Sequence, residues 1–155
     1  MKKLSNLREH LIKQVPELAT NPDQLLTYIE TGKIAFSPGN NLSHRYSFQA
    51  VVVITDWRKE ADSIFIPILE WLAVVEPGFN PDEALSFEAD ILSLEAIDII
   101  IKLNLTERVI VKDTEAVRTI QHVIPPTPLR FEQGTTLQFI VDGPLGSAEL
   151  PEQTE

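Results

Sequence analysis

Carboxylates are the most abundant side chains in this sequence that could do chemistry. Asp56, Glu60 and Asp62 lie close together along the chain, and two such groups could serve a hydrolase as general acid and general base. The chain contains 23 acidic residues, so close spacings of this kind also arise by chance. We therefore interpret Asp56 and Asp62 as residues that begin a turn or a helix, and all three as part of a hydrated acidic surface.

The histidines and the lack of cysteine limit the other reactive sites. His10, His44 and His122 lie far apart and form no H-x-H or H-E-x-x-H motif, which argues against a histidine-based metal site. A chain without cysteine has no disulfide scaffold, no thiol nucleophile, no zinc ribbon and no iron–sulfur site. We predict that the protein binds no metal and no cofactor.

The glycines and serines form no catalytic or phosphate-binding motif. The sequence has no G-x-S-x-G elbow, no G-x-x-x-x-G-K loop and no G-x-G-x-x-G turn, and each of its six glycines is isolated beside turn residues. A Ser–His–Asp arrangement would come together only in the fold and leaves no sequence signature. We predict that the protein is not an enzyme.

The charge of the chain argues against nucleic-acid binding. It has 13 basic and 23 acidic residues, a formal charge of −10, and the acids are concentrated from Asp56 to Asp98, where eleven acidic residues accompany two basic ones. Such a surface repels phosphate, and the few basic residues near the N-terminus and at Arg58–Lys59 are best explained as hydrated surface. The longest apolar stretch, residues 63–75, contains Glu70 and is too short to cross a bilayer, so no membrane contact is expected.

Two aromatic residues are candidates for a protein interface. Trp57 follows a predicted strand within the charged stretch TDWRKE, and Phe79 lies among turn residues. Exposed aromatic side chains beside arginine are enriched at protein interfaces, so we predict a partner surface at Trp57, Arg58 and Phe79. Such a surface needs a partly exposed Trp57, and a packed position for this side chain is the equal alternative. Trp71, in contrast, falls on the apolar stripe of a predicted helix and is expected in the core.

The first third of the chain predicts two helices. Apolar residues recur every three or four positions over residues 4–15, and Pro16 ends this helix. A second helix is expected from Asn21, which could act as N-cap before Pro22, to Gly32. A short strand is predicted at residues 33–37.

The remaining elements predict an antiparallel sheet and one central helix. Alternation of apolar residues indicates strands at residues 43–55, 87–91 and 97–105, with extensions of the sheet at residues 109–111 and 118–123. Residues 60–75 have helical spacing. We favour a helix start near Ser63, which would place Pro67 in the first turn, over a helix that is kinked at Pro67. The predicted fold is α+β: an antiparallel sheet with an N-terminal helix pair and a central amphipathic helix packed on it.

The predicted domain covers residues 1–124. The sequence PPTP then begins an extended segment, residues 125–145, which contains a candidate extra strand at residues 135–141. Residues 146–155 carry three glutamates and no basic residue, and are expected to form a disordered acidic tail.

In this order the elements resemble the phage tail completion protein R (GpR) family of contractile-tailed temperate phages. LREHLIKQVPELATNPDQLLTYIETGKI, residues 7–34, resembles the opening helix pair of the family, and YSFQAVVVITDW, residues 46–57, its long strand. PILEWL, residues 67–72, resembles the helix that a proline leads, and LTERVIV, residues 105–111, the closing strand. The resemblance covers residues 1–124, and the sequence beyond them departs from the family pattern.

The resemblance implies a tail-terminator-like structural virion protein without catalytic residues. Such a protein completes or terminates the tail tube and enables head–tail joining through protein–protein assembly. The implied partners are tail tube and head–tail connector proteins, with a homo-oligomeric ring, commonly a hexamer, in the virion and a monomer in dilute solution. The implied location is the host cytoplasm during assembly and then the virion tail.

We call the acid-rich stretch from Asp56 to Asp98 the acidic block. It would have a specific role if DNA passes through such a ring. Negative charge along the channel would prevent tight contacts with phosphate, so we hypothesise that part of the block faces the channel. The candidates are Asp56, Glu60, Asp62 and Asp90.

Two other functions remain as alternatives. A small acidic, soluble module that binds a basic protein, as immunity proteins do, would suit the same composition. A hydrolase using Asp56, Glu60 or Asp62 is the other alternative, and a deep pocket that holds two of these carboxylates would favour it.

Overall fold

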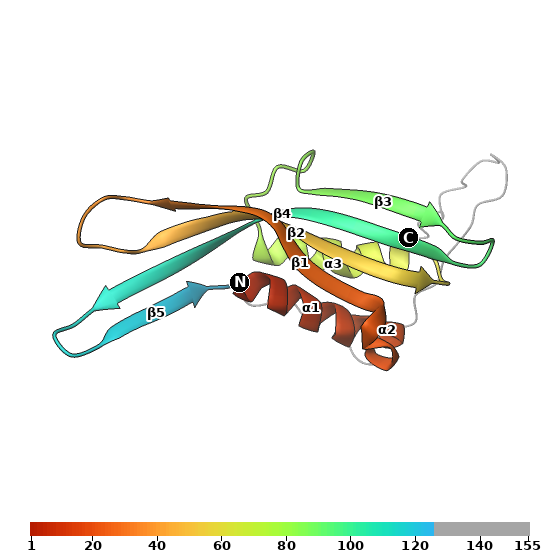
Figure 1. The fold of residues 1–155 in the computed structure, drawn as a ribbon, viewed down its shortest axis with the longest axis horizontal. Helices are drawn as coiled ribbons and strands as arrows, with labels where there is room; N and C mark the ends of the chain where they lie inside the picture. The colour runs from red at the N-terminus through yellow and green to blue at the C-terminus, as the bar shows by residue number, and fades with distance from the viewer. Residues whose placement is uncertain (126–155) are drawn as a thin grey trace, which may run out of the picture.

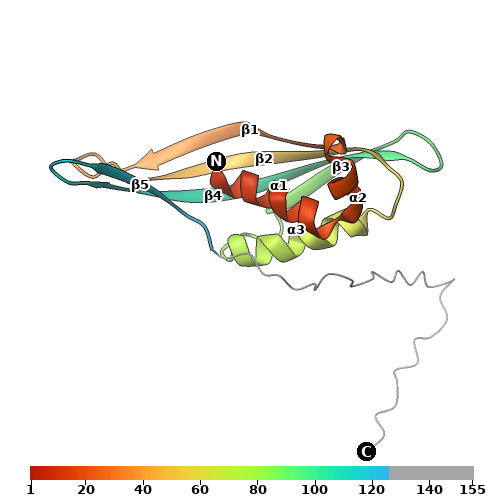
Figure 2. The same cartoon turned by 90° about the horizontal axis from the view of Figure 1, so that it is seen from below.

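The described part of the chain forms a five-stranded antiparallel sheet with helices on one face. The computed structural model describes residues 1–125, and Figures 1 and 2 show α1 and α3 side by side beneath the sheet, with α2 at one end of α1. The predicted α+β class is confirmed. The helical elements are α1 (Lys2–Gln14), α2 (Pro16–Thr20), the 3₁₀ turn η1 (Pro22–Gln24) and α3 (Asp62–Val75). The strands are β1 (Leu25–Phe36), β2 (His44–Trp57), β3 (Leu85–Ile91), β4 (Ile97–Asp113) and β5 (Arg118–Val123).

The strands follow the order β1-β2-β4-β3, and every pairing is antiparallel. β4 is the longest strand: its first part pairs with β3 and its last part with β5. β3 and β5 therefore pair with successive parts of one strand. From residue 126 onward, the predictions of an extended segment, an extra strand and an acidic tail lie outside the described residues.

The predicted strand alternation is confirmed where the helices cover the sheet. On β4 the buried side chains include Ile99, Ile101, Leu103 and Leu105, and on β2 they include Phe48, Ala50, Val52 and Ile54. These residues face α1 and α3 and form the core with Trp71, which is fully buried as predicted. The extensions of the sheet at residues 109–111 and 118–123 are also confirmed.

The two long helices form close to their predicted positions. α1 ends at Gln14, before Pro16, and buries Leu4, Leu7 and Leu11. α3 begins at Asp62, which places Pro67 in the second turn rather than the first. None of the helices within residues 1–125 is long and apolar enough to span a membrane.

The prediction of a helix over residues 21–32 is wrong. Asn21 and Pro22 do begin a helical turn, but it ends at Gln24 and the chain continues as β1. Side chains then alternate, with Leu25 3% exposed and Leu26 58% exposed. Hydrogen bonding to β2 favours an extended conformation for this segment. The separate short strand predicted at residues 33–37 is the last part of the same strand, β1. The second helix of the N-terminal pair is instead the short α2, which starts at Pro16.

The sheet extends beyond the helices at one end. The β1–β2 hairpin (residues 31–48) and the β4–β5 hairpin (residues 108–123) reach past the helix layer, and we call these two hairpins the arm (Figures 1 and 2). The face of the arm that continues the core face carries the exposed side chains of Ile34, Phe36 and Ile120. The opposite end of the molecule carries β3 and the β3–β4 turn.

Candidate functional site

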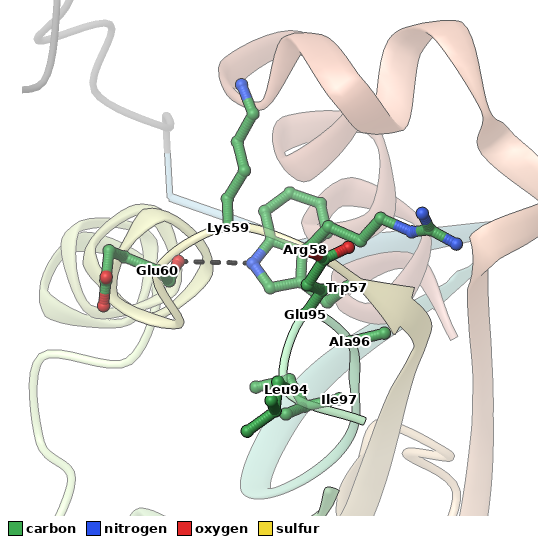
Figure 3. Close-up of a pocket in the computed structure, with 8 residues that line it drawn as sticks. All are labelled: Trp57, Arg58, Lys59, Glu60, Leu94, Glu95, Ala96 and Ile97. Carbon is green, nitrogen blue, oxygen red and sulfur yellow. Dashed lines mark hydrogen bonds between the residues drawn. The ribbon is translucent and has the colours of Figure 1, made fainter. Parts of the chain in front are cut away.

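An open groove lies where β2 ends and the β3–β4 turn approaches it. It has a volume of about 670 Å³ and is lined by residues 57–60 on one side and residues 94–97 on the other (Figure 3). Two of the three residues predicted as a partner surface, Trp57 and Arg58, line this groove. The third, Phe79, lies in the α3–β3 connection and is half-buried against the core.

Trp57 is not in the partly exposed position but in the packed alternative, because only 2% of the residue is exposed. A β-bulge explains the difference: between Ile54 and Trp57 the strand contains one residue more than the facing part of β4. The extra residue turns Trp57 to the core face and leaves Asp56 with a φ of 51°. The indole N–H donates a hydrogen bond of 3.2 Å to the carbonyl of Glu60 (Figure 3).

The basic residues beside the groove have acidic partners. Arg58 pairs with Asp56 at 3.2 Å, and Lys59 pairs with Glu17 of α2. Burial raises the pKa of Glu17, but the hydrogen bond from Lys59 and the glutamate's own backbone amide outweigh it, so the pKa is lowered overall. The backbone N–H of Asp56 donates a 2.8 Å hydrogen bond to Asp98 of β4. These contacts fix the end of β2 between α2 and the β3–β4 hairpin.

The acidic candidates do not come together in one pocket. Asp56, Glu60, Asp62 and Asp90 are all exposed. Glu60 borders the groove, whereas Asp56 borders a second, smaller one of about 320 Å³ beside α2. Each groove therefore holds one of the three carboxylates considered for hydrolysis. Within residues 1–125 no group of histidines and carboxylates could hold a metal ion.

A buried carboxylate that the sequence reasoning missed lies at Glu107. It occupies a core-facing position of β4, is 0% exposed, and accepts hydrogen bonds from the backbone amides of Lys2 at 3.1 Å and Lys3 at 2.9 Å. His122 of β5 contacts the same carboxylate. Glu107 thus satisfies the N-terminal amides of α1, which have no partners inside the helix, and its negative charge suits the positive end of the helix dipole.

The environment of Glu107 lowers its pKa. Burial alone raises the pKa of a carboxyl group, but the hydrogen bonds from the Lys3 and Lys2 amides and from His122 together outweigh burial. The signal was present in the sequence, because Glu107 interrupts an otherwise apolar alternation along β4 between Leu105 and Val109. Its role is to join the start of α1 to β4 and β5.

Glu76, at the end of α3, completes this buried cluster. Its carboxylate pairs with the Lys3 ammonium at 2.7 Å and accepts a 3.3 Å hydrogen bond from the backbone N–H of Thr106, whose hydroxyl also contacts it. Thr106 lies on β4 between the segments that pair with β3 and with β5. Glu76 therefore occupies the gap in the strand pairing along this edge of β4.

Comparison with known proteins finds one family. The family model described as P2 phage tail completion protein R (GpR) matches residues 1–126. Among characterised proteins, the chain is similar to tail completion protein R of Escherichia phage P2, with 32% identity over 133 residues, which cover 83% of this chain and 86% of the phage P2 protein. No solved structure matches the chain.

Proposed function

Because the chain belongs to the P2 phage tail completion protein R (GpR) family, and so has a structural role in tail completion, we propose that it acts at the end of the tail tube and makes it competent to join the head. The proposal rests on the family match, which spans residues 1–126 and therefore every described helix and strand. The similarity to tail completion protein R of phage P2 over most of both chains supports the same conclusion.

The protein works by assembly and not by catalysis. In the described part of the chain the candidate carboxylates lie apart and exposed, and the buried ionic groups around Glu107 serve to hold α1, α3, β4 and β5 together. A reacting group must reach its substrate, which Glu107 cannot do while it is fully buried.

The partners are the tail tube and the head–tail connector proteins. The protein assembles in the host cytoplasm as a homo-oligomeric ring and remains a part of the virion tail. In dilute solution the subunit is a monomer, because each interface of a ring is modest and ring closure supplies the additional avidity. It contacts no membrane and binds no nucleic acid sequence-specifically.

Part of the acidic block between Asp56 and Asp98 faces the channel of this ring, and the exposed carboxylates of Asp56, Glu60, Asp62 and Asp90 are the candidates for it. Their exposure is consistent with that role, because hydrated negative charge prevents tight contact with DNA phosphates. Electron cryomicroscopy of the assembled tail end tests the proposal. Carboxylates along the channel wall are expected, and a ring with all four on its outer surface would overturn it.

Deleting the gene from a phage that carries it tests the function. The expected particles are separate heads and tails, or overlong tails, by electron microscopy, and infectivity should return when the full chain is supplied in trans. Normal infectious particles from the deletion would show that the protein is not needed to complete the tail.

A further inference from the structure

Both edges of the sheet are unpaired within residues 1–125. One edge is β1, which pairs only with β2; the other consists of β3 and β5, which pair only with successive parts of β4. Each of these strands presents a row of backbone N–H and C=O groups on its outer side. Such an edge can add a strand from another chain, and soluble proteins usually protect it. Here neither edge is covered by a helix in Figures 1 and 2.

β3 has one apolar face and one acidic face. Phe87 and Ile91 lie on the side that faces the helices, yet Ile91 is 80% exposed because the helix layer covers little of this edge. Glu88 and Asp90 lie on the opposite side. Residues 82–98 contain six acidic residues and no basic one, so this end of the molecule is strongly negative.

The arm has the same pattern with the opposite charge. Ile34 and Phe36 of β1 lie on the core side, and Phe36 is 69% exposed. Lys33 lies on the other side, and the arm contains five basic and two acidic residues in a chain of net charge −10. The arm is therefore a basic, partly apolar end of an acidic protein.

A like-charge pair on the arm points to an acidic partner. Arg45 of β2 lies directly opposite Arg108 of β4, both are exposed, and neither forms an ion pair within residues 1–125. Two like charges facing each other across neighbouring strands destabilise the pairing. Carboxylates from a partner would remove this repulsion.

We propose that residues 31–36 of β1 pair with β3 of a second copy of this chain, so that one sheet runs through both copies. The apolar side chains of the two edges would then share one face, and Lys33 and Arg45 would lie near Glu88 and Asp90 of the neighbour on the other. The proposal rests on the proposed ring and identifies the surfaces that build it.

The topology and the charges favour this head-to-tail contact over a symmetric one. With four antiparallel strands in the order β1-β2-β4-β3, the two edge strands run in opposite directions, so a repeat of the same sheet gives an antiparallel junction. Pairing β3 with another β3 would bring acids together, and pairing two arms would bring bases together. A heterologous contact of this kind can close a ring.

Charge reversal on each edge tests the contact with full-length chains. K33E/R45E makes both edges acidic, and E88K/D90K makes both edges basic. Each variant alone should associate about tenfold more weakly, or worse, than the unchanged chain in a sedimentation series, and should fail to restore plaques to the gene-deleted phage. An equal mixture of the two variants should regain both association and plaque formation, because the acidic edges of one variant then meet the basic edges of the other.

The matched control is E9K/K13E, which exchanges two exposed charges on α1 and should behave as the unchanged chain does. All variants should show the same circular dichroism spectrum and thermal midpoint. Full plaque formation by each edge variant alone would overturn the proposal. So would two defective variants whose mixture stays defective, because the edges would then contact a different tail protein or another segment of the chain.

The two proposals can fail separately. If the gene deletion leaves normal particles, the proposed function fails whatever the edge variants do. If the deletion abolishes infectivity and the edge variants still complement it, the function stands and only the proposed contact is wrong.

Discussion

At residue 107 the alternation that builds the core of β4 places a carboxylate in a row of leucine and valine side chains. It is tolerated there because two helical amides and His122 bond to it. Removing one partner from such an arrangement leaves buried donors unsatisfied, and this cost exceeds the mean value of a hydrogen bond.

Glu107→Gln should therefore lower the free energy of unfolding by about 2–4 kcal/mol at neutral pH. Because the folded-state pKa of Glu107 lies below its ordinary value of 4.5, its contribution is complete above that value and is lost as the pH falls through the folded pKa. The difference in unfolding free energy between the unchanged chain and Glu107→Gln should therefore become smaller in acid. Urea unfolding at several pH values measures it, with the exposed Glu9→Gln as the control; an equal loss in the control would contradict the assignment.

His10 gives the second prediction at this scale. Burial in α1 lowers its pKa below 6.5, against the opposing effect of a 3.0 Å contact between Nε2 and the Pro67 carbonyl, and nearby Lys13 lowers it further. The unfolded chain then binds a proton more readily than the folded one, so stability should fall as the pH decreases from 6.5 to the folded pKa. His10→Gln keeps a donor for Pro67 and should flatten this part of the stability curve. An unchanged slope in urea unfolding would contradict it.

At the scale of elements, period-two alternation was the most reliable signal. Five apolar residues in strict alternation correctly predicted β4, and helical spacing correctly placed α1 and α3. Local capping residues were a weaker guide at Asn21, because they specified one turn and not a helix. Pairing with β2 decided the conformation of residues 25–36, and no local pattern reports that long-range gain.

The burial of Leu25 and Leu26 distinguishes the observed strand from the predicted helix. Neighbouring residues of a helix can share its apolar face, so a helix could bury both side chains, whereas the strand buries only Leu25. Leu25→Ala should cost about 2–4 kcal/mol of unfolding free energy, and Leu26→Ala less than about 1 kcal/mol. Urea unfolding of the two variants provides the comparison, and similar losses at both positions would favour the helix.

The candidate site shows a different limit of sequence reasoning. Trp57 and Arg58 do line the groove, but the burial of Trp57 depends on a single extra residue in β2, and a bulge changes the face without changing the composition. Glu107 could have been found, because an acid in a core-facing row is visible in the sequence. Its partners could not, since they come from α1 and β5, far away along the chain.

For the whole molecule, the family resemblance predicted the function more fully than any single residue did. The described residues explain why: a protein that acts through surfaces needs no constellation of reactive groups, and its signature is the order of its elements. The contrast between the basic arm and the acidic β3 end emerges only when the strands are aligned, because Lys33, Arg45 and Arg108 are separated along the chain.

The domain boundary gives the last prediction. The family match ends at residue 126, and Ile124 is the last described apolar residue that packs against the core. Buried polar side chains within residues 1–125 are all hydrogen-bonded, so this part is expected to be self-sufficient. A chain that ends at Pro125 should therefore unfold cooperatively in urea, with a free energy within about 1 kcal/mol of the full chain. Loss of cooperativity or a larger fall in stability would mean that residues 126–155 complete the core, and the domain would then have to be extended to include them.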